Sequence, residues 1–385
     1  MTTETPATTQ AIVVVAKGQV EIQEIPVPKV HGDWILVKVK AVGLNPADWK
    51  SIHGDWSDAG TRVGCDYAGV VVEVGPEVTK DFKKGDRIAG WTHGGTIFST
   101  DRNRLRRECG AFGGYALVKQ HVQMKIPDNI TDEEAATFGI SITTVGQGLY
   151  SPQGLSLPPP TAPSPTPLPV FIYGGATATG IYGVQFAKAS GLRVVAACSP
   201  RHFELVRGLG ADAVFDYADA ARCAAEARAF AGGRLRAAWD CTGQGVEICA
   251  EALRWDDDDD GKKEKEEEGE GEQEQEQPTY ATIVAMPEER LREANPRVRG
   301  PRYTLGYDAI GEDYVTWCGE VKADAERRDF ADWFWGVSER LLRDGTVRPL
   351  RPEVNRWGAG LEGVLKGLED LKAGKVRGTK LVYTL

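Results

Sequence analysis

The sequence of 385 residues lacks several features that define other classes of protein. No apolar run approaches the roughly 20 residues that a membrane-spanning helix needs, so no transmembrane segment is expected. The polar, Thr-rich residues 1–10 show no basic stretch followed by an apolar one, and we therefore expect no secretory signal peptide. None of the seven cysteines forms a C-x-x-C pair. Scattered cysteines of this kind are typical of reduced thiols, which predicts a cytoplasmic protein.

The acidic charge of the chain is confined to one segment. Residues 256–277 hold 13 acidic and 3 basic residues, which accounts for the whole net charge of −10. The rest of the chain is charge-balanced and has no clustered basic excess, so a nucleic-acid partner is not expected. The segment contains no apolar residue and cannot contribute to a core, which predicts a disordered insertion over 256–277. A binding role for this insertion is the alternative.

Two patterns of apolar residues predict an α/β protein with two domains. Short runs rich in β-branched residues, separated by Gly and Pro, occupy most of residues 11–118 and predict a barrel-like β domain. Strand and helix patterns then alternate over residues 170–240, which predicts βαβ units and a doubly wound parallel sheet. Between these parts, the Pro-rich residues 156–169 predict a stiff surface loop.

The first strand of the alternating region leads into a candidate nucleotide site. Residues 170–180 (VFIYGGATATG) combine an apolar strand, a glycine turn and the start of a helix. Small residues there let the backbone approach a diphosphate, which the free N–H groups of the helix N-terminus bind. Glycine turns before helices also occur in α/β proteins without a nucleotide, so the flanking strand and helix carry the prediction. We expect the Thr177 hydroxyl to donate to a phosphate.

The end of the next strand indicates which cofactor is used. Residues 198–202 (CSPRH) offer a hydroxyl and a guanidinium but no carboxylate for a ribose 2′-hydroxyl. That combination suits a 2′-phosphate and predicts NADPH. Tyr217, just after the third strand, is expected to stack on or bond the adenosine. For Arg201, a solvated surface position is the alternative.

At this point three segments resemble the medium-chain dehydrogenase/reductase superfamily. Residues 64–71 (GCDYAGVV) resemble its G-H-E-x-x-G-x-V element, residues 84–88 (KGDRI) its x-G-D-x-V element, and residues 375–382 (KVRGTKLV) its closing segment. The resemblance implies a GroES-like β-barrel catalytic domain formed by residues 1–137 and 318–385. It also implies a Rossmann NADPH-binding domain formed by residues 138–317.

The zinc-dependent branch of that superfamily holds its metal through a Cys and the His and Glu of G-H-E. This chain has Asn45, Cys65 and Asp66 at those positions, and residues 91–113 contain only one cysteine. Adjacent residues of an extended strand point to opposite sides, so Cys65 and Asp66 are not expected to converge on one ion. No metal is expected.

A closer resemblance is to fungal trans-acting enoyl reductases. Residues 45–50 (NPADWK), 139–150 (GISITTVGQGLY) and 173–179 (YGGATAT) carry it. It implies reduction, by NADPH, of the α,β-double bond of a polyketide thioester. The substrate would be bound to an acyl carrier on a partner megasynthase, a polyketide synthase or a polyketide–peptide hybrid synthase. Resemblance to this group favours a monomer, whereas many members of the superfamily are dimers, so the oligomeric state stays open.

The same resemblance implies the site residues. Catalysis is assigned to Lys50 and Thr144. The cofactor-binding positions are Ala47, Asp48, Trp49, Lys50, Gly174, Ala176, Thr177, Ala178, Thr179, Ser199, Pro200, Arg201, His202, Tyr217, Ile283, Val284, Lys375 and Val376. The substrate-binding positions are Thr144, Val145, Gly146, Gln147, Gly148, Leu149, Tyr150, Gly306, Tyr307, Asp308, Ala309 and Ile310.

Two other functions fit the same residues. A stand-alone NADPH quinone or alkenal reductase would share the fold, the cofactor and the chemistry but would need no protein partner. A non-catalytic nucleotide-binding interaction protein would bind NADPH and turn over no enone. Four basic residues form either a docking surface for an acidic carrier domain or a solvated loop: Arg102, Arg104, Arg106 and Arg107.

Overall fold

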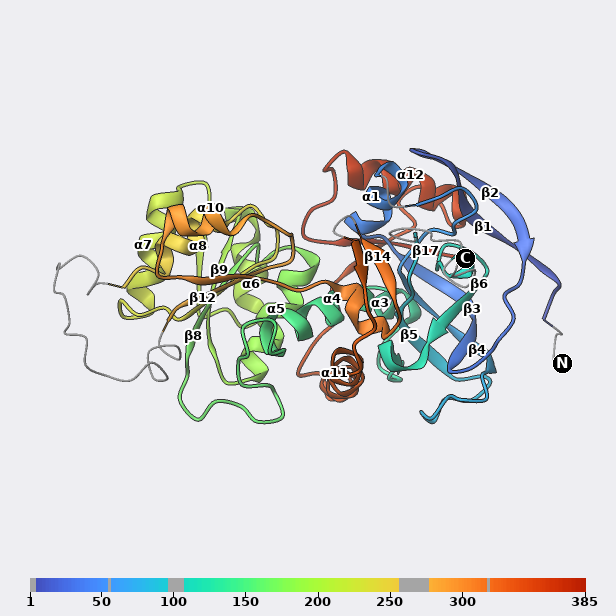
Figure 1. The fold of residues 1–385 in the computed structure, drawn as a ribbon, viewed down its shortest axis with the longest axis horizontal. Coiled ribbons are helices and arrows are strands. Elements are labelled where there is room, and N and C mark those ends of the chain that lie inside the picture. The colour runs from blue at the N-terminus through green and yellow to red at the C-terminus, as the bar shows by residue number, and fades with distance from the viewer. Residues whose placement is uncertain (1–4, 55–56, 96–106, 256–276, 317–318) are drawn as a thin grey trace. The chain divides into compact units, whose positions relative to one another are not determined.

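A computed structural model describes residues 5–54, 57–95, 107–255, 277–316 and 319–385 of the chain, and it divides into two compact units (Figure 1). Unit 1 combines Met1–Thr143 with Gly306–Leu385, and unit 2 is Thr144–Leu305. The predicted domain boundaries are 137/138 and 317/318, whereas the two units are divided at 143/144 and 305/306. Residues 306–310 belong to unit 1, where the Tyr307 ring lies 5.9 Å from that of Trp91. Of the predicted acidic insertion, all but Gln277 lies outside the described residues.

Unit 1 is built on a seven-stranded sheet and two small hairpins. The hairpins are β1 (Thr8–Ala16) with β2 (Gln19–Pro26), and β14 (Tyr314–Thr316) with β15 (Gly319–Val321). The large sheet has the order β16 (Pro352–Val354), β17 (Lys380–Thr384), β3 (Trp34–Gly43), β4 (Asp66–Val74), β5 (Arg87–Trp91) and β7 (Gln123–Lys125), and β6 (Tyr115–Lys119) also pairs with β3. Its helices are α1 (Pro46–His53), η1 (Gln120–Val122), α3 (Asp132–Ala135), η5 (Gly306–Ile310), α11 (Ala325–Arg343) and α12 (Leu361–Lys372).

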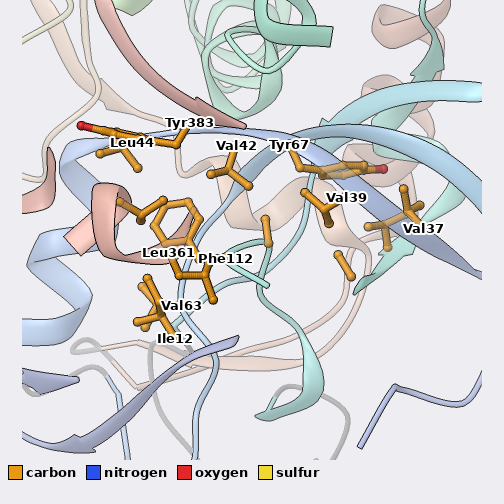
Figure 2. Packing of buried hydrophobic residues seen from close by; sticks show 14 of the residues in the cluster. Ile12, Val37, Val39, Val42, Leu44, Val63, Tyr67, Phe112, Leu361 and Tyr383 are labelled. Carbon is orange, nitrogen blue, oxygen red and sulfur yellow. The ribbon is translucent and has the colours of Figure 1, made fainter. Parts of the chain in front are cut away.

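Strand β3 is the centre of this sheet. One edge of β3 pairs with β6 over its first half and with β17 over its second half, while the other edge pairs with β4 along nearly its whole length. Val37, Val39 and Val42 of β3 share one buried core cluster with Tyr67, Phe112 and Leu361 (Figure 2). Gly64, which precedes β4, has a φ of +100°, and a Cβ there would lie 2.3 Å from the Phe112 ring, so the core requires glycine at this position.

Unit 2 is a six-stranded parallel sheet with helices on both faces (Figure 1). The strand order is β10 (Ala213–Asp216), β9 (Arg193–Cys198), β8 (Pro169–Tyr173), β11 (Ala237–Asp240), β12 (Thr279–Thr282) and β13 (Arg299–Tyr303). The helices are α5 (Ala178–Ala189), η3 (Pro200–His202), α6 (Phe203–Gly208), α7 (Ala220–Phe230), α8 (Val246–Ala252) and α10 (Glu288–Ala294). Helix α4 (Gly139–Val145) and the π-helix η2 (Gly146–Tyr150) lead into the unit from the β-rich part.

Alternation along the strands explains why both faces of this sheet are covered. Phe171 and Tyr173 of β8 belong to one apolar cluster with α7, α8 and α10. On the opposite face, the Trp239 indole fills a slot that glycines open for it. A Cβ on Gly148 of η2 would lie 2.4 Å from that indole, and one on Gly183 of α5 would lie 2.5 Å from it.

The predicted fold class is therefore confirmed: a GroES-like β unit accompanies a doubly wound parallel sheet. The Pro-rich residues 156–169 form irregular, largely exposed chain before β8, as predicted. Helix α5 begins three residues earlier than the pattern from residue 181 indicated, because the Thr177 side chain caps it. Within the described part of the chain, no helix combines the length and apolar character needed to cross a membrane.

Candidate active site

The turn after β8 has the geometry of a phosphate-binding loop. Gly174 has a φ of +81°, and a Cβ on Gly180 would lie 2.2 Å from the Gly174 carbonyl oxygen, so the turn closes only with glycine at both positions. Ala176, Ala178 and Thr179 are half-exposed around it. The N-terminal N–H groups of α5 have no partner within the helix, which leaves them for an anion.

The Thr177 hydroxyl has a different role from the predicted one. It donates to the Gly174 carbonyl oxygen at 2.8 Å and accepts the Gly180 N–H at 3.0 Å. A hydroxyl has one proton, and this one is used within the turn. The prediction that the Thr177 hydroxyl donates to a phosphate is therefore corrected: this side chain caps α5 and holds the turn closed. The Thr177 backbone N–H also donates within the turn, to the Gly174 carbonyl oxygen at 2.9 Å.

The other predicted cofactor residues of unit 2 follow neighbouring strands at the same edge of the sheet. Ser199, Pro200, Arg201 and His202 follow β9, Tyr217 follows β10, and Ile283 and Val284 follow β12. All strands are parallel, so these positions share the carboxyl edge with the turn after β8. The strand order reverses between β8 and β11, and the carboxyl edge at such a reversal is where doubly wound sheets bind ligands.

Individual side chains at this edge differ in exposure and in partners. Arg201 is exposed and forms no ion pair with any of the described residues. The Tyr217 ring packs 5.9 Å from that of Tyr173 and is half-buried. Val284 is 39% exposed and lies against Gly243 of the loop after β11. The structure thus brings the adenosine-side and diphosphate-side candidates together on one unit.

Sequence reasoning missed the residue that shapes the loop after β11. Asp240 is fully buried at the end of that strand. One carboxylate oxygen accepts the N–H groups of Thr242 and Gly243 at 2.8 and 2.9 Å, and the other accepts the Gly245 N–H at 2.7 Å and the Tyr280 hydroxyl at 3.0 Å. One sequence pattern could have predicted this role: an Asp at the end of an apolar strand, followed by a T-G-x-G loop. A Cβ on Gly174 would lie 2.7 Å from the Thr242 side chain, so Asp240 also defines one wall of the phosphate turn.

In unit 1, α1 carries the residues predicted to lie beside the nicotinamide ribose. Lys50 is exposed, with its ammonium 5.9 Å from the centre of the Trp49 ring. Ala47 and Trp49 are half-exposed. Asp48 is fully buried: its carboxylate accepts the Asn45 N–H at 2.7 Å and the Cys65 N–H at 3.1 Å. A side chain with no exposed surface does not reach a cofactor, so the prediction of direct contact for Asp48 is corrected to a role in holding the start of α1.

Burial, together with the neighbouring Asp66, raises the pKa of the Asp48 carboxyl to about 7, against the lowering effect of the two N–H groups and Lys380. The folded state therefore holds a proton on Asp48 at pH values where the unfolded chain does not. The stability that this proton contributes is lost as pH rises through about 7. We expect wild type to lose roughly 2–3 kcal/mol of unfolding free energy relative to Asp48→Asn between pH 5 and pH 8. Urea unfolding of both proteins at each pH measures this, and parallel pH profiles would contradict it.

Lys375 and Val376, also predicted to bind the cofactor, follow α12. The Lys375 ammonium lies 3.2 Å from the Asp370 carboxylate, and its side chain is otherwise largely exposed. Helix α12 contacts α1 through Lys372, whose ammonium is 2.6 Å from Nε2 of His53. The two candidate segments of unit 1 therefore lie on neighbouring helices.

The predicted substrate-binding residues fall into two groups. Thr144 is half-exposed, whereas Val145, Gly146, Gln147, Gly148, Leu149 and Tyr150 are buried. Gly148 faces Trp239, and the Tyr150 hydroxyl accepts from the Ser190 hydroxyl at 2.9 Å. For Gly148 and Tyr150, the prediction of substrate contact is corrected, because both face the interior of unit 2.

The second group, η5, contributes to an aromatic cluster of unit 1. The Tyr307 ring lies 4.5 Å from that of His93 and 5.9 Å from that of Trp91. Asp308 binds the Tyr314 hydroxyl and the Arg327 guanidinium. Gly306 is half-exposed, whereas Ala309 and Ile310 are buried. The nearby Thr143 hydroxyl accepts from both Trp91 and Trp335, each at 2.9 Å, which fixes the start of the segment leading to Thr144.

Comparison with known proteins agrees with this architecture. Residues 31–128 match the alcohol dehydrogenase GroES-like domain family, and residues 178–254 match the zinc-binding dehydrogenase family. Trans-enoyl reductase resD of Aspergillus sclerotiorum is 37% identical over 389 aligned positions, which cover 97% of this chain and 99% of that protein. Trans-enoyl reductase ACTTS2 of Alternaria alternata is 36% identical, covering 98% of this chain and 99% of that protein.

Two solved structures share the fold at low sequence identity. The CurK enoyl reductase has a TM-score of 0.69 at 16% identity, covering 98% of this chain and 99% of that one. A mycobacterial protein complexed with NADPH has a TM-score of 0.66 at 19% identity, covering 98% of this chain and all of that one.

The fold and the site therefore define an oxidoreductase of the medium-chain dehydrogenase/reductase type that acts on a CH–CH bond and has the nucleotide-binding fold of NAD(P)H enzymes. Within that superfamily, the chain belongs to the fungal trans-enoyl reductases.

The residues at the zinc position of the superfamily do not fit a zinc ion. Asp66 is occupied at both oxygens, by the Ile140 N–H at 2.8 Å and by the Lys380 ammonium. Burial and the nearby carboxylates of Asp48 and Asp66 raise the pKa of the Cys65 thiol well above its usual range, which disfavours the thiolate that zinc binds. Within the described ranges, no three His, Cys, Asp or Glu side chains are grouped as metal ligands. No catalytic step is therefore assigned to a metal.

Proposed function

We propose that this chain is a trans-acting enoyl reductase that uses NADPH to reduce the α,β-double bond of a polyketide thioester held by a partner synthase. The observation that carries the proposal is the pairing of two features in one chain. Unit 2 presents a glycine turn and an exposed arginine at one sheet edge, and unit 1 presents an exposed Lys50 on a helix whose start is capped by the buried Asp48. The relatives named trans-enoyl reductases, similar over nearly the whole chain, support it.

In the proposed reaction, the cofactor supplies a hydride from C4 of the nicotinamide to the β-carbon of the enoyl thioester. Lys50 holds the nicotinamide ribose hydroxyls and takes part in the proton relay that completes reduction at the α-carbon. Charge develops on the thioester oxygen during the step, and donors near that oxygen lower the barrier. The Thr144 hydroxyl is assigned to this region. No metal is needed to polarise the carbonyl.

The test of the function is NADPH oxidation by the purified chain. An enoyl thioester on a phosphopantetheine carrier and a simple quinone are compared as substrates, with enoyl-pantetheine as the carrier-free form. Turnover of the thioester supports the proposal. Turnover of the quinone alone would instead support the stand-alone reductase, and NADPH binding without any turnover would support a non-catalytic protein.

Cofactor preference is proposed to rest on residues 199–202. An exposed guanidinium after β9 with no ion-pair partner among the described residues is available for the 2′-phosphate. We expect Arg201→Ala to weaken NADPH binding roughly tenfold or more, equivalent to about 1.4 kcal/mol, and to leave NADH binding nearly unchanged. Nicotinamide fluorescence titration with both cofactors measures this. An equal loss for both would remove Arg201 from the 2′-phosphate site.

We also propose that the chain works as a single copy in the cytoplasm. One of the two edge strands of the parallel sheet is β13, which contains Gly300 and Pro301. Proline lacks a backbone N–H, and this discourages pairing of that edge with a second copy. The six cysteines of the described ranges are free thiols, in keeping with a reducing compartment. Light scattering should give one chain of 41.8 kDa.

A further inference from the structure

A lysine ammonium lies in the interior of unit 1, where the side chains do not fit a metal. Lys380 of β17 is 2% exposed. Its ammonium donates to Oδ1 of Asn45 at 2.9 Å, to the Asp66 carboxylate and to the Thr137 carbonyl oxygen at 3.4 Å. Three oxygens from three separate segments therefore surround one positive charge.

Each of these segments leads directly to a part of the candidate active site. Asn45 precedes α1, the helix that carries Lys50. The second oxygen of Asp66 accepts the Ile140 N–H at 2.8 Å in α4, the helix that contains Thr144. Thr137 lies in the turn between α3 and α4. The ammonium of the last strand is thus bonded to the residue before the Lys50 helix, to the turn before α4 and, through Asp66, to α4 itself.

The amide of Asn45 shows that the ammonium sets the local geometry. A lysine ammonium has only donors, so it must face Oδ1 and not Nδ2. Nδ2 of Asn45 is consequently buried without a hydrogen-bond partner among the described residues. Leaving a buried donor unpaired is unfavourable. The hydrogen bond from Lys380 to the amide oxygen offsets this unfavourable term, and it fixes Asn45, the residue before α1, against Lys380.

The charges of the cluster explain why a cation is required. Asp48 and Asp66 are both fully buried. The Asp48 carboxyl group accepts hydrogen bonds from the backbone N–H groups of Asn45 and Cys65. Where both carboxyl groups are ionised, they would repel each other without a nearby cation and distort the start of α1. In the zinc-dependent branch that the sequence resembles, the positions of Asn45, Cys65 and Asp66 hold a metal.

We propose that Lys380 is a positioning residue whose ammonium takes the place of the metal cation and holds α1, with Lys50, and α4 in their active arrangement. This inference rests on the proposed function for the role of Lys50. It assigns no contact between Lys380 and the substrate or the cofactor, because the side chain is buried.

The test compares two buried lysines of unit 1. Lys119 is 8% exposed and is bonded to Asp33 and Glu312, each at 2.7 Å, so it resembles Lys380 in burial and charge but does not contact α1 or α4. We expect Lys380→Met to lower kcat for the enoyl thioester at least tenfold while its Kd for NADPH changes less than threefold. Lys119→Met should lower thermal stability but leave kcat within about twofold of wild type. Equal kcat losses in the two variants, or a wild-type kcat in Lys380→Met, would overturn the proposal.

Amide hydrogen exchange gives a second readout that does not depend on turnover. Exchange in residues 45–53 and 138–145 should be at least tenfold faster in Lys380→Met than in wild type or Lys119→Met. Unchanged exchange there overturns the positioning role. If wild type reduces no enoyl thioester, the proposed function fails, but the exchange result still decides whether Lys380 orders the two helices.

A double variant keeps the proposal testable if Lys380→Met does not fold. Asp66→Asn combined with Lys380→Met removes both charges of the pair and leaves the Asn oxygen to accept the Ile140 N–H. We expect this protein to fold and to show the same loss of kcat and the same faster exchange in α1. Wild-type values for both in the folded double variant would overturn the proposal.

Discussion

Replacing Lys50 by alanine should lower kcat for the enoyl thioester by roughly 10²–10⁴, the range typical of a lost group in proton transfer. The side chain is exposed at the end of a helix whose start is held by buried groups, so the fold should not change. Steady-state NADPH oxidation and the melting temperature are measured on the same preparation. Lys84→Ala, at another exposed lysine of unit 1, is the matched control and should have wild-type values for both.

The kinetic constants of Lys50→Ala separate two roles. Loss of kcat with little change in the Kd for NADPH would place Lys50 in the proton relay. A parallel loss of NADPH affinity would add a role in holding the ribose. Wild-type turnover in the variant would show that Lys50 takes no part in catalysis, and any catalytic group on α1 would then be another residue of that helix.

Gly180→Ala should weaken NADPH binding at least tenfold, or about 1.4 kcal/mol. The added Cβ would lie 2.2 Å from the Gly174 carbonyl oxygen and 2.9 Å from Cα of Gly175, so the turn must open and the first N–H groups of α5 must move away from the diphosphate. Overpacking of this kind also costs about 1–3 kcal/mol of stability. Fluorescence titration and urea unfolding measure the two effects.

The control for this variant is a glycine with open space. Gly208 lies at the end of α6 in the same unit, and a Cβ there would meet no atom within 4 Å. Gly208→Ala should therefore keep wild-type NADPH affinity and gain slightly in stability, because alanine favours the helix. If Gly180→Ala bound NADPH as tightly as Gly208→Ala, the turn after β8 would not be the diphosphate site.

The elements of unit 2 could be predicted because their signals are local. The alanine-rich pattern over residues 220–230 and the apolar run over 237–240 correspond to α7 and β11 with the same bounds. A strand, a turn and a helix that follow each other in the chain also lie next to each other in space. The glycine turn between β8 and α5 could be predicted for the same reason.

The Lys380 cluster could not be found in this way. Lys380 and Asp66 are 314 positions apart, and no period or spacing connects them. The roles of Thr177 and Asp48 were misassigned for a related reason. Both residue types bind phosphates and sugars in other sites, and only the three-dimensional structure shows that here their polar atoms are already bonded within the protein.

Helix α11 illustrates a limit of periodicity. A helical apolar stripe through residues 330, 333, 334 and 337 would bury Trp333, yet Trp333 is 39% exposed and the fully buried tryptophan is Trp335. Successive aromatic residues at 330, 333, 334 and 335 fit more than one apolar stripe. Burial of the Trp335 indole is possible because its N–H donates to the Thr143 hydroxyl. The apolar pattern of the helix gives no information about this partner, which lies far away in the sequence.

The pairing of β17 with β3 has a consequence for the nascent chain on the ribosome. Unit 2 is continuous in sequence and has all of its strands once residue 303 has been made. Unit 1 begins the chain but waits for β17 and the ammonium of Lys380, which are synthesised last. During translation β3 must therefore remain without β17 on one of its edges while the complete second unit forms. A chain that stops before residue 380 has every residue of the Lys50 helix and none of the cation that we propose sets it in place.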